Sequence, residues 1–300
     1  MTLYIGLMSG TSMDGVDGVL VDFSADARSG LHVLADAHAA MPSPLGAELL
    51  ALNRSGPDEL QRAALAANAL ARLQAEVVAR LLNQTDTEPH AVRAVLNIGG
   101  IANVTILPSK DESAPTDASS LIGFDTGPGN ALMDHWCLRH TDAPYDDGGR
   151  WAASGQVDGM LLVELMADAY FRKAPPKSTG RDLFNADWLA QALAPADVQA
   201  TLLELTARTA IDALRTAAPG TRELLVCGGG ARNGALMARL AALRPGLAVA
   251  ATDSAGLPAQ QVEAAAFAWL ARQFCERRPG NHPGVTGAAG LRVLGALYPH

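Results

Sequence analysis

The chain has 300 residues, of which 49% are hydrophobic and 18% charged, and its formal net charge is −8 at pH 7. This length accommodates two domains with cores of their own. The negative charge argues against a general nucleic-acid surface, which needs clustered Lys and Arg, but not against a nucleotide held by backbone amides and a metal ion. No apolar run reaches membrane-spanning length, no leader-like pattern opens the chain, and three widely spaced cysteines indicate neither a disulfide framework nor a zinc site. We therefore expect a cytoplasmic protein.

Periodicity and turn signals predict alternating strands and helices, and hence an α/β fold. Three strands come first, at residues 3–7, 16–23 and 31–38, and alanine-rich helices follow at 45–53 and 58–83. Further strands are predicted at 92–98, 104–107, 121–124, 224–227 and 248–252. Further helices are predicted at 131–140, 161–167, 186–193, 197–217, 233–243 and 261–275.

The first two predicted strands are joined by a turn of small, hydroxyl and acidic residues, Gly10-Thr11-Ser12-Met13-Asp14-Gly15-Val16-Asp17. Glycine lets the backbone approach a ligand closely, and the N–H groups of such a turn can converge on an anion. Thr11 and Ser12 add hydroxyl donors, while Asp14 and Asp17 could hold a divalent cation through water. No Lys-Ser/Thr pair follows, so this is not a Walker A loop. The alternative is an ordinary hairpin turn.

The same strand–turn–strand device occurs again at residues 96–105, where Asn97 and Asn103 bracket Gly99-Gly100. Because Gly-Gly is a common turn pair, a plain hairpin is one interpretation. The two asparagines fit phosphate or metal contacts equally well. One such hairpin in each half of the chain indicates two similar α/β domains that face a nucleotide between them.

A third glycine-rich segment, Asp125-Thr126-Gly127-Pro128-Gly129-Asn130, is predicted as a turn between a strand and a helix. A helix N-terminus readily binds an anion. The alternative is that Asn130 only caps the helix.

Gly228-Gly229-Gly230 follows a predicted strand and fits two functions. The strand, the glycine run, the next helix and a strand that leads to Asp253 resemble a dinucleotide-binding unit, with an acid about twenty residues on. A glycine triplet has no side chains, so it also leaves a flat backbone surface on which an adenine and a ribose can lie. We favour the adenosine pocket, because the dinucleotide interpretation leaves both hairpin loops unexplained.

Two further segments carry charged residues that could meet a ligand. The loop at 175–185 contains Lys177-Ser178-Thr179 and Arg181, whose cations could bind an anionic sugar or phosphates, although such loops are often simply solvated. Glu263 stands near the start of the last predicted helix, where the helix dipole favours an acid whatever its function.

Taken together, these motifs closely resemble the anhydro-N-acetylmuramic acid kinases of bacteria. The resemblance runs from Gly6-Leu7-Met8-Ser9-Gly10 to Val285-Thr286-Gly287-Ala288. It implies an actin-like, sugar-kinase ATPase fold, in which two ribonuclease-H-like domains surround a nucleotide cleft. The implied activity is ATP-dependent phosphorylation of 1,6-anhydro-N-acetylmuramic acid with opening of the anhydro ring by water, which gives N-acetylmuramate 6-phosphate in peptidoglycan recycling. A homodimer is implied as well.

The resemblance also implies roles for the motifs. Residues 10–17 would form the first phosphate loop, 97–103 the second, and 228–230 the adenosine pocket, with Mg²⁺ near Asp14 or Asp125. The implied nucleotide-binding residues are Gly10, Thr11, Ser12, Met13, Asp14, Gly15, Val16, Asp17, Asn97, Gly99, Gly100, Asn103, Asp125, Gly127, Gly228, Gly229 and Gly230. The implied substrate or cleft residues are Lys177, Ser178, Thr179, Arg181 and Glu263.

The chain departs from the family between the helix ending near residue 83 and the strand that contains Asn97. There the family has a long segment with a Cys-His-Gly-Gln-Thr motif, an Asp-Phe-Arg motif whose aspartate is the general base, and a Gly-Gly-Gln-Gly-Ala-Pro loop. Here Arg93-Ala94 leads directly into Val95, and none of these motifs occurs. No residue is therefore assigned as the general base. A nucleotide-binding relative with impaired catalysis is the alternative function.

The missing segment would belong to the first domain's sheet. We expect an incomplete first domain at residues 1–94, a second domain at 95–283, and a C-terminal segment at 284–300 that returns to the first. The loss of strands would leave the first sheet with an unpaired edge and an uncovered helix face.

Overall fold

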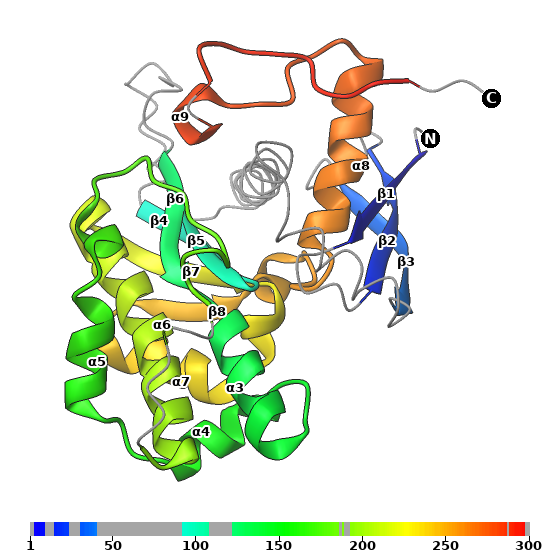
Figure 1. Cartoon of the computed structure of the whole chain (residues 1–300). Helices are drawn as coiled ribbons and strands as arrows, with labels where there is room; N and C mark the ends of the chain where they lie inside the picture. The colour runs from blue at the N-terminus through cyan, green and yellow to red at the C-terminus, as the bar shows by residue number, and fades with distance from the viewer. Residues whose placement is uncertain are drawn as a thin grey trace.

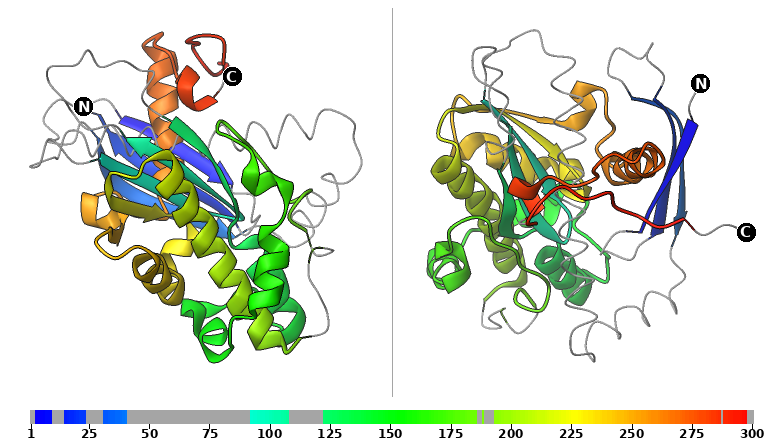
Figure 2. Two further views of the ribbon diagram at one scale, coloured as in Figure 1. Left: turned by 90° about the vertical axis from the view of Figure 1, so that its left-hand side faces the viewer. Right: turned by 90° about the horizontal axis from the view of Figure 1, so that it is seen from above.

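The computed structural model describes residues 3–9, 15–23, 31–40, 92–107, 122–185, 188, 193–286 and 288–297. Two β-sheets lie on opposite sides of helix α8 (Val262–Cys275), as Figure 1 and the view from above in Figure 2 show. The helices predicted at 45–53 and 58–83, the turn at 10–14 and most of the helix predicted at 186–193 lie outside the described residues.

The first sheet consists of three antiparallel strands in the order β1-β2-β3. Tyr4, Met8 and Val19 share one face and belong to the core around α8, because alternate residues of a strand point to the same side. The three strands predicted first are confirmed, with ends that shift by one or two residues. Their bounds are β1 (Leu3–Ser9), β2 (Gly15–Asp22) and β3 (His32–Ala40).

The second sheet has five strands in the order β6-β5-β4-β7-β8, and only β5 runs antiparallel to the rest. This order and this single reversed strand are those of a ribonuclease-H-like domain, so the predicted α/β class is confirmed. The bounds are β4 (Val92–Ile98), β5 (Ile101–Leu107), β6 (Ile122–Pro128), β7 (Thr221–Cys227) and β8 (Ala248–Ala251).

The prediction of a turn at 125–130 is wrong for residues 125–128. Strand β6 continues to Pro128, because Asp125 pairs with Asn103 and Gly127 with Ala102 across a β-bulge in β5. Acidic, glycine and proline residues favour turns locally, but pairing with the neighbouring strand determines the conformation here. Asp125 therefore lies in the sheet and not in a loop.

Helices cover the face of the second sheet that is turned away from the first (Figure 1). The longest, α6, buries Val198, Leu202 and Leu205 in a core shared with Leu96 and Ile98 of β4. The predicted helices at 131–140, 161–167, 197–217 and 233–243 are confirmed, whereas α4 was not predicted. The bounds are α3 (Ala131–Thr141), α4 (Arg150–Ser154), α5 (Gly159–Met166), α6 (Pro195–Ala217) and α7 (Gly234–Leu243).

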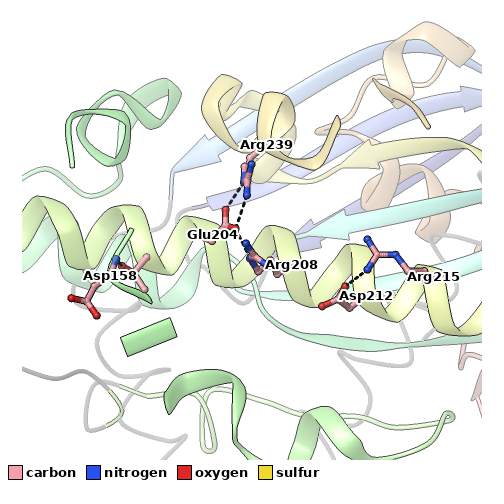
Figure 3. A network of polar contacts seen from close by, with 7 residues as sticks. Asp158, Glu204, Arg208, Asp212, Arg215 and Arg239 are labelled. Carbon is pink, nitrogen blue, oxygen red and sulfur yellow. Dashed lines mark hydrogen bonds and ion pairs between the residues drawn. The ribbon is translucent and has the colours of Figure 1, made fainter. Parts of the chain in front are cut away.

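A buried ion-pair network joins α6 to α7 within this layer (Figure 3). Glu204 of α6 accepts a hydrogen bond of 2.7 Å from Arg239 Nη2 of α7 and also contacts Arg208 one turn away. The Glu204 side chain is only 3% exposed, whereas Arg208 and Arg239 reach solvent. The network therefore fixes how two helices of the second unit pack together.

Helix α8 packs closely on the first sheet. A Cβ added at Gly6 would lie 1.9 Å from the Ala264 carbonyl oxygen and 2.6 Å from the Ala268 nitrogen, so only glycine allows this approach. The same helix shares a core with Val95 and Leu225 of the second sheet. Helix α8 is thus the described element that holds the two sheets together.

The division of the chain remains a proposal, which the strand pairing refines. Ala94 lies inside β4 and pairs with Ile106, so we place the division before Val92. The short α9 (Pro283–Thr286) contacts β6, and Gly295 lies against Phe274 of α8. No helix in the described ranges combines the length and the apolar character that crossing a membrane requires.

Candidate functional site

A row of polar residues crosses the second sheet on the side facing α8 and the first sheet. Asp125, Asn103 and Asn97 lie directly opposite one another on β6, β5 and β4, and Cys227 of β7 pairs with Asn97. All four side chains are buried. Opposed residues share a face of the sheet, so this row, Asp125–Asn103–Asn97–Cys227, is a continuous polar strip between the two units.

Part of this face is not satisfied by hydrogen bonds within the described structure. Asn103 Oδ1 and Thr105 Oγ1 are buried and have no hydrogen-bond partner among the described residues. Buried polar atoms are nearly always paired, because an unpaired one costs about 1–3 kcal/mol. A polar ligand between the two sheets would remove that cost.

Asp125 anchors the loop that carries the predicted substrate residues. Its Oδ2 accepts hydrogen bonds from Ser178 Oγ at 2.9 Å and from the Thr179 N–H at 2.8 Å, and its own N–H donates to the Lys177 carbonyl at 3.0 Å. The Tyr170 hydroxyl donates to the Asp125 carbonyl at 2.8 Å. One carboxylate oxygen is thus already committed to this loop, a connection that the sequence did not reveal.

Lys177 turns back toward an aromatic cluster. Its ammonium group lies 4.7 Å from the centre of the Tyr170 ring and 3.3 Å from the Tyr170 carbonyl oxygen. Desolvation by the surrounding protein, and to a smaller extent the charge of Lys173, lower the pKa of Lys177, while Asp125 opposes this shift. The charge of Lys177 therefore helps to hold the loop in place.

The Gly99–Gly100 turn is fastened to the start of α3. The Gly100 carbonyl accepts hydrogen bonds from the N–H groups of Gly129 and Ala131, and the Gly99 carbonyl accepts one from Asn130. The N–H groups of Gly129, Asn130 and Ala131 are thus used by this turn and are not available to an anion. Asn130 does not cap the helix through its side chain either, because its Nδ2 donates to the Ile98 carbonyl at 3.1 Å.

The glycine triplet meets the same turn from β7. A Cβ added at Gly228, where φ is +78°, would lie 2.5 Å from Asn97 Oδ1, and one added at Gly230 would lie 2.5 Å from the Ile98 side chain. Gly229 is exposed and has only the Asn130 amide nitrogen near its Cβ position, at 3.2 Å. The structure therefore brings the Gly99–Gly100 turn and the glycine triplet together at the end of β4.

Two acids near the triplet differ in their surroundings. Asp253 Oδ2 accepts a hydrogen bond of 3.2 Å from the Ala259 N–H, so it holds its own loop, which weakens the dinucleotide interpretation. Glu263 lies in the first turn of α8. Burial raises the pKa of the Cys227 thiol strongly, and the charge of Glu263 raises it further, so Glu263 stands beside the Cys227 end of the polar row.

The remaining predicted residues are only partly described. Residues 10–14 lie outside the described part, whereas Gly15, Val16 and Asp17 lie in β2, with Asp17 opposite Met8. Arg181 lies over Gly100. In the described ranges, no three His, Cys, Asp or Glu residues are grouped as a metal site would require.

Two side chains of this site escaped the sequence analysis. Asn130 links the ends of β4 and α3 through Ile98, whereas from the sequence its side chain was considered only as an alternative helix cap. Gln260 Nε2 donates to the Gly228 carbonyl at 2.7 Å, and no sequence signal marks this contact.

Comparison with known proteins gives a match over nearly the whole chain. The family model described as anhydro-N-acetylmuramic acid kinase matches residues 2–95 and 87–300. The anhydro-N-acetylmuramic acid kinase of Bordetella petrii is 48% identical over 376 residues, which cover 99% of this chain and 96% of that protein. The kinase of Ralstonia nicotianae is 45% identical, with 99% and 97% covered, and that of Variovorax paradoxus is 48% identical, with 99% of each covered.

Solved structures are more distant. An activator of 2-hydroxyisocaproyl-CoA dehydratase from Clostridium difficile, with bound ADPNP, is 13% identical with a TM-score of 0.48, over 92% of this chain and 96% of that one.

The matches also locate an internal gap. The alignment with the Bordetella petrii protein spans 376 residues, whereas this chain has 300. The family match is split into two parts that meet at residues 87–95. Several dozen positions of the relatives therefore have no counterpart here, and the predicted missing segment is confirmed at the predicted place.

Proposed function

Because the chain belongs to the anhydro-N-acetylmuramic acid kinase family, we propose that it uses ATP to phosphorylate 1,6-anhydro-N-acetylmuramic acid while water opens the anhydro ring. The product would be N-acetylmuramate 6-phosphate, for peptidoglycan recycling. The observation that carries the proposal is 48% identity over 99% of the chain. By the same resemblance, we propose a homodimer that acts in the cytoplasm.

The proposed reaction requires groups that hold the phosphates and a base that accepts a proton from water. Water forms the new bond to the anomeric carbon, O6 leaves that carbon and accepts the γ-phosphoryl group, and ADP departs. The proton lost by water must pass to a base. In the proposed arrangement, residues 10–17 and the turn from Asn97 to Asn103 hold the phosphates, and Gly228–Gly230 receive the adenosine. The polar row supports this, because it lies on the face of the second sheet that is turned toward the first unit.

Mg²⁺ belongs to the same proposal. Asp125 offers carboxylate oxygen and its neighbours Asn97 and Asn103 offer amide oxygen, and Mg²⁺ in proteins prefers oxygen ligands and retains several waters. Asp14 is the second proposed ligand. When bound, the ion would neutralise charge on the phosphates. One Asp125 oxygen already holds the 178–179 loop, so these residues suit contact through water better than a direct ligand cage.

A second candidate function follows from the gap at residues 87–95. The segment that is absent corresponds to the part of the family that carries the general-base aspartate. A general base contributes roughly 10²–10⁴ in rate. The alternative is therefore a nucleotide-binding relative with impaired catalysis.

Formation of N-acetylmuramate 6-phosphate tests both functions. The natural chain is compared with a chain in which a relative's missing segment is inserted just before Val92, so that β4 stays intact. We expect the spliced chain to be about 10²-fold or more faster at saturating ATP. Equal activity of the two would show that another residue, such as Glu263, serves as the base. If neither chain forms product or binds ATP, the proposed function is wrong.

A further inference from the structure

Arg181 occupies the space above the second phosphate turn. A Cβ added at Gly100 would lie 2.9 Å from Arg181 Nη2 and 3.1 Å from its Nε. The φ angle of Gly100 is not in the left-handed region, so glycine is needed here for space and not for conformation. Any side chain at residue 100 would displace the guanidinium group.

The charge of Arg181 remains available to a ligand. Its side chain is exposed to solvent, yet the protein around it desolvates the guanidinium and lowers its pKa, while Asp134 opposes this shift. The other cation of the loop, Lys177, is turned toward Tyr170.

The surroundings of the turn make a cation necessary for binding phosphates. Asp125 is the first member of the polar row, Glu263 acts electrostatically on Cys227 at the other end of the row, and Asp134 acts on Arg181. Like charges disfavour the approach of a polyanion. A nucleotide with two or three phosphates therefore needs a positive charge on this side of the cleft.

We propose that Arg181 binds the terminal phosphates of the nucleotide at the Gly99–Gly100 turn, and does not bind the sugar. This inference rests on the proposed function and deepens it. The guanidinium group presents a planar fork that binds phosphate oxygens in a bidentate manner. Since α3 fixes the turn beneath it, Arg181 is positioned to offset the negative charge on the transferred phosphoryl group.

Nucleotide binding by calorimetry tests the assignment, with AMPPNP, ADP and AMP as probes and the anhydro sugar as a fourth ligand. We expect Arg181→Gln to weaken AMPPNP binding about ten- to a hundredfold, ADP binding less, and AMP and sugar binding hardly at all. Arg181→Lys should recover part of the loss, because it keeps the charge without the fork. Arg222→Gln removes an exposed arginine at the start of β7, far from the turn, and is the matched control.

A second variant separates phosphate binding from a general loss of structure. Gly100→Ala should displace the guanidinium and reproduce the loss of AMPPNP affinity, and the double variant should lose no more than either single one. Equal losses for AMP and AMPPNP, or a loss confined to the sugar, would overturn the role of Arg181 and leave the kinase proposal standing. A natural chain that binds no nucleotide would overturn both.

Discussion

The two sheets use the same antiparallel hairpin but are completed to very different degrees. The second sheet has five strands, with α3 to α7 on one face and α8 on the other. The first has three strands, and within the described structure its main helix contacts are with α8. A hairpin can therefore form from its local sequence, whereas its stability depends on the layers of helices packed around it.

The exposure of apolar strand residues differs between the two sheets. In the first, Leu3 and Leu34 are 47% and 42% exposed, although both lie in strands. In the second, Ala94 to Ile98 of β4 are all buried. Apolar strand residues normally lie against another layer. The family match is split at residues 87–95, and we predict that the segment missing there would supply such a layer to the first sheet.

Hydrogen exchange provides the largest expected contrast between the units. We expect slow exchange for amides at 96–98 of β4 and 224–227 of β7, and much faster exchange at 32–38 of β3. Local opening free energies range from near zero up to the global value, so the difference should reach ~5 kcal/mol. Uniform protection in both sheets would show that the first sheet is as stable as the second.

A substitution at Gly6 would break the connection between the units. Gly6→Ala places a methyl group within 1.9 Å of the Ala264 carbonyl oxygen, and neither backbone can yield easily. Such overpacking should lower the free energy of unfolding by ~2–3 kcal/mol, measured by urea denaturation. Proteolysis of β1 to β3 should become faster than that of β4.

Gly159 provides the control for that substitution. A Cβ added there meets nothing within 4 Å, and the residue begins α5. Gly159→Ala should be neutral or stabilise by ~0.4–1 kcal/mol. If Gly6→Ala is equally harmless, the close contact between β1 and α8 does not exist in solution.

The fold was predictable where local sequence and tertiary pairing agree. The strand at 92–98 was predicted with both ends correct, because the apolar run Ala94-Val95-Leu96 lies at its centre and is buried on both faces of the sheet. The residues from Asp125 to Pro128 were predicted as a turn, because their chemistry favours turns, and pairing with β5 overrode that preference. Helix α4 has only five residues and follows two glycines with positive φ, so its periodicity was too short to detect.

The site was predictable as a set of motifs but not as a set of contacts. The sequence located the second turn, the glycine triplet and the loop with Lys177 and Arg181. It did not show that Lys177 turns toward Tyr170 while Arg181 covers Gly100, because those contacts join segments that are far apart in the chain. Asn130 was judged by its position before a helix, although its side chain bonds to Ile98 of β4.

The smallest expected effect is on stability and comes from Glu204, which lies within the second unit. Burial acts to raise the pKa of Glu204, but hydrogen bonds from Arg239 and Arg208 outweigh it and hold the pKa below its ordinary value. A carboxyl with a lowered pKa stabilises the folded state above its unfolded pKa of about 4.3, and this contribution is lost as the pH falls through the folded value. Glu204→Gln should therefore cost ~1–2 kcal/mol at pH 7. The cost should begin to shrink below the unfolded pKa of about 4.3 and should disappear only once the pH has fallen below the lowered folded pKa.

Asp212→Asn on the same helix is the matched control, because Asp212 pairs with Arg215 where both are 46–57% exposed. Exposed pairs contribute only about 0–1 kcal/mol, so the control should change stability little at neutral or acidic pH. Urea denaturation at pH 7 and at a series of acidic pH values below about 4 measures both variants. Since Glu204 joins α6 to α7, its substitution should leave exchange in β3 unchanged while it accelerates exchange in α7. Faster exchange in both sheets would mean that the two units unfold as one, and that the first sheet draws its stability from the helices of the second.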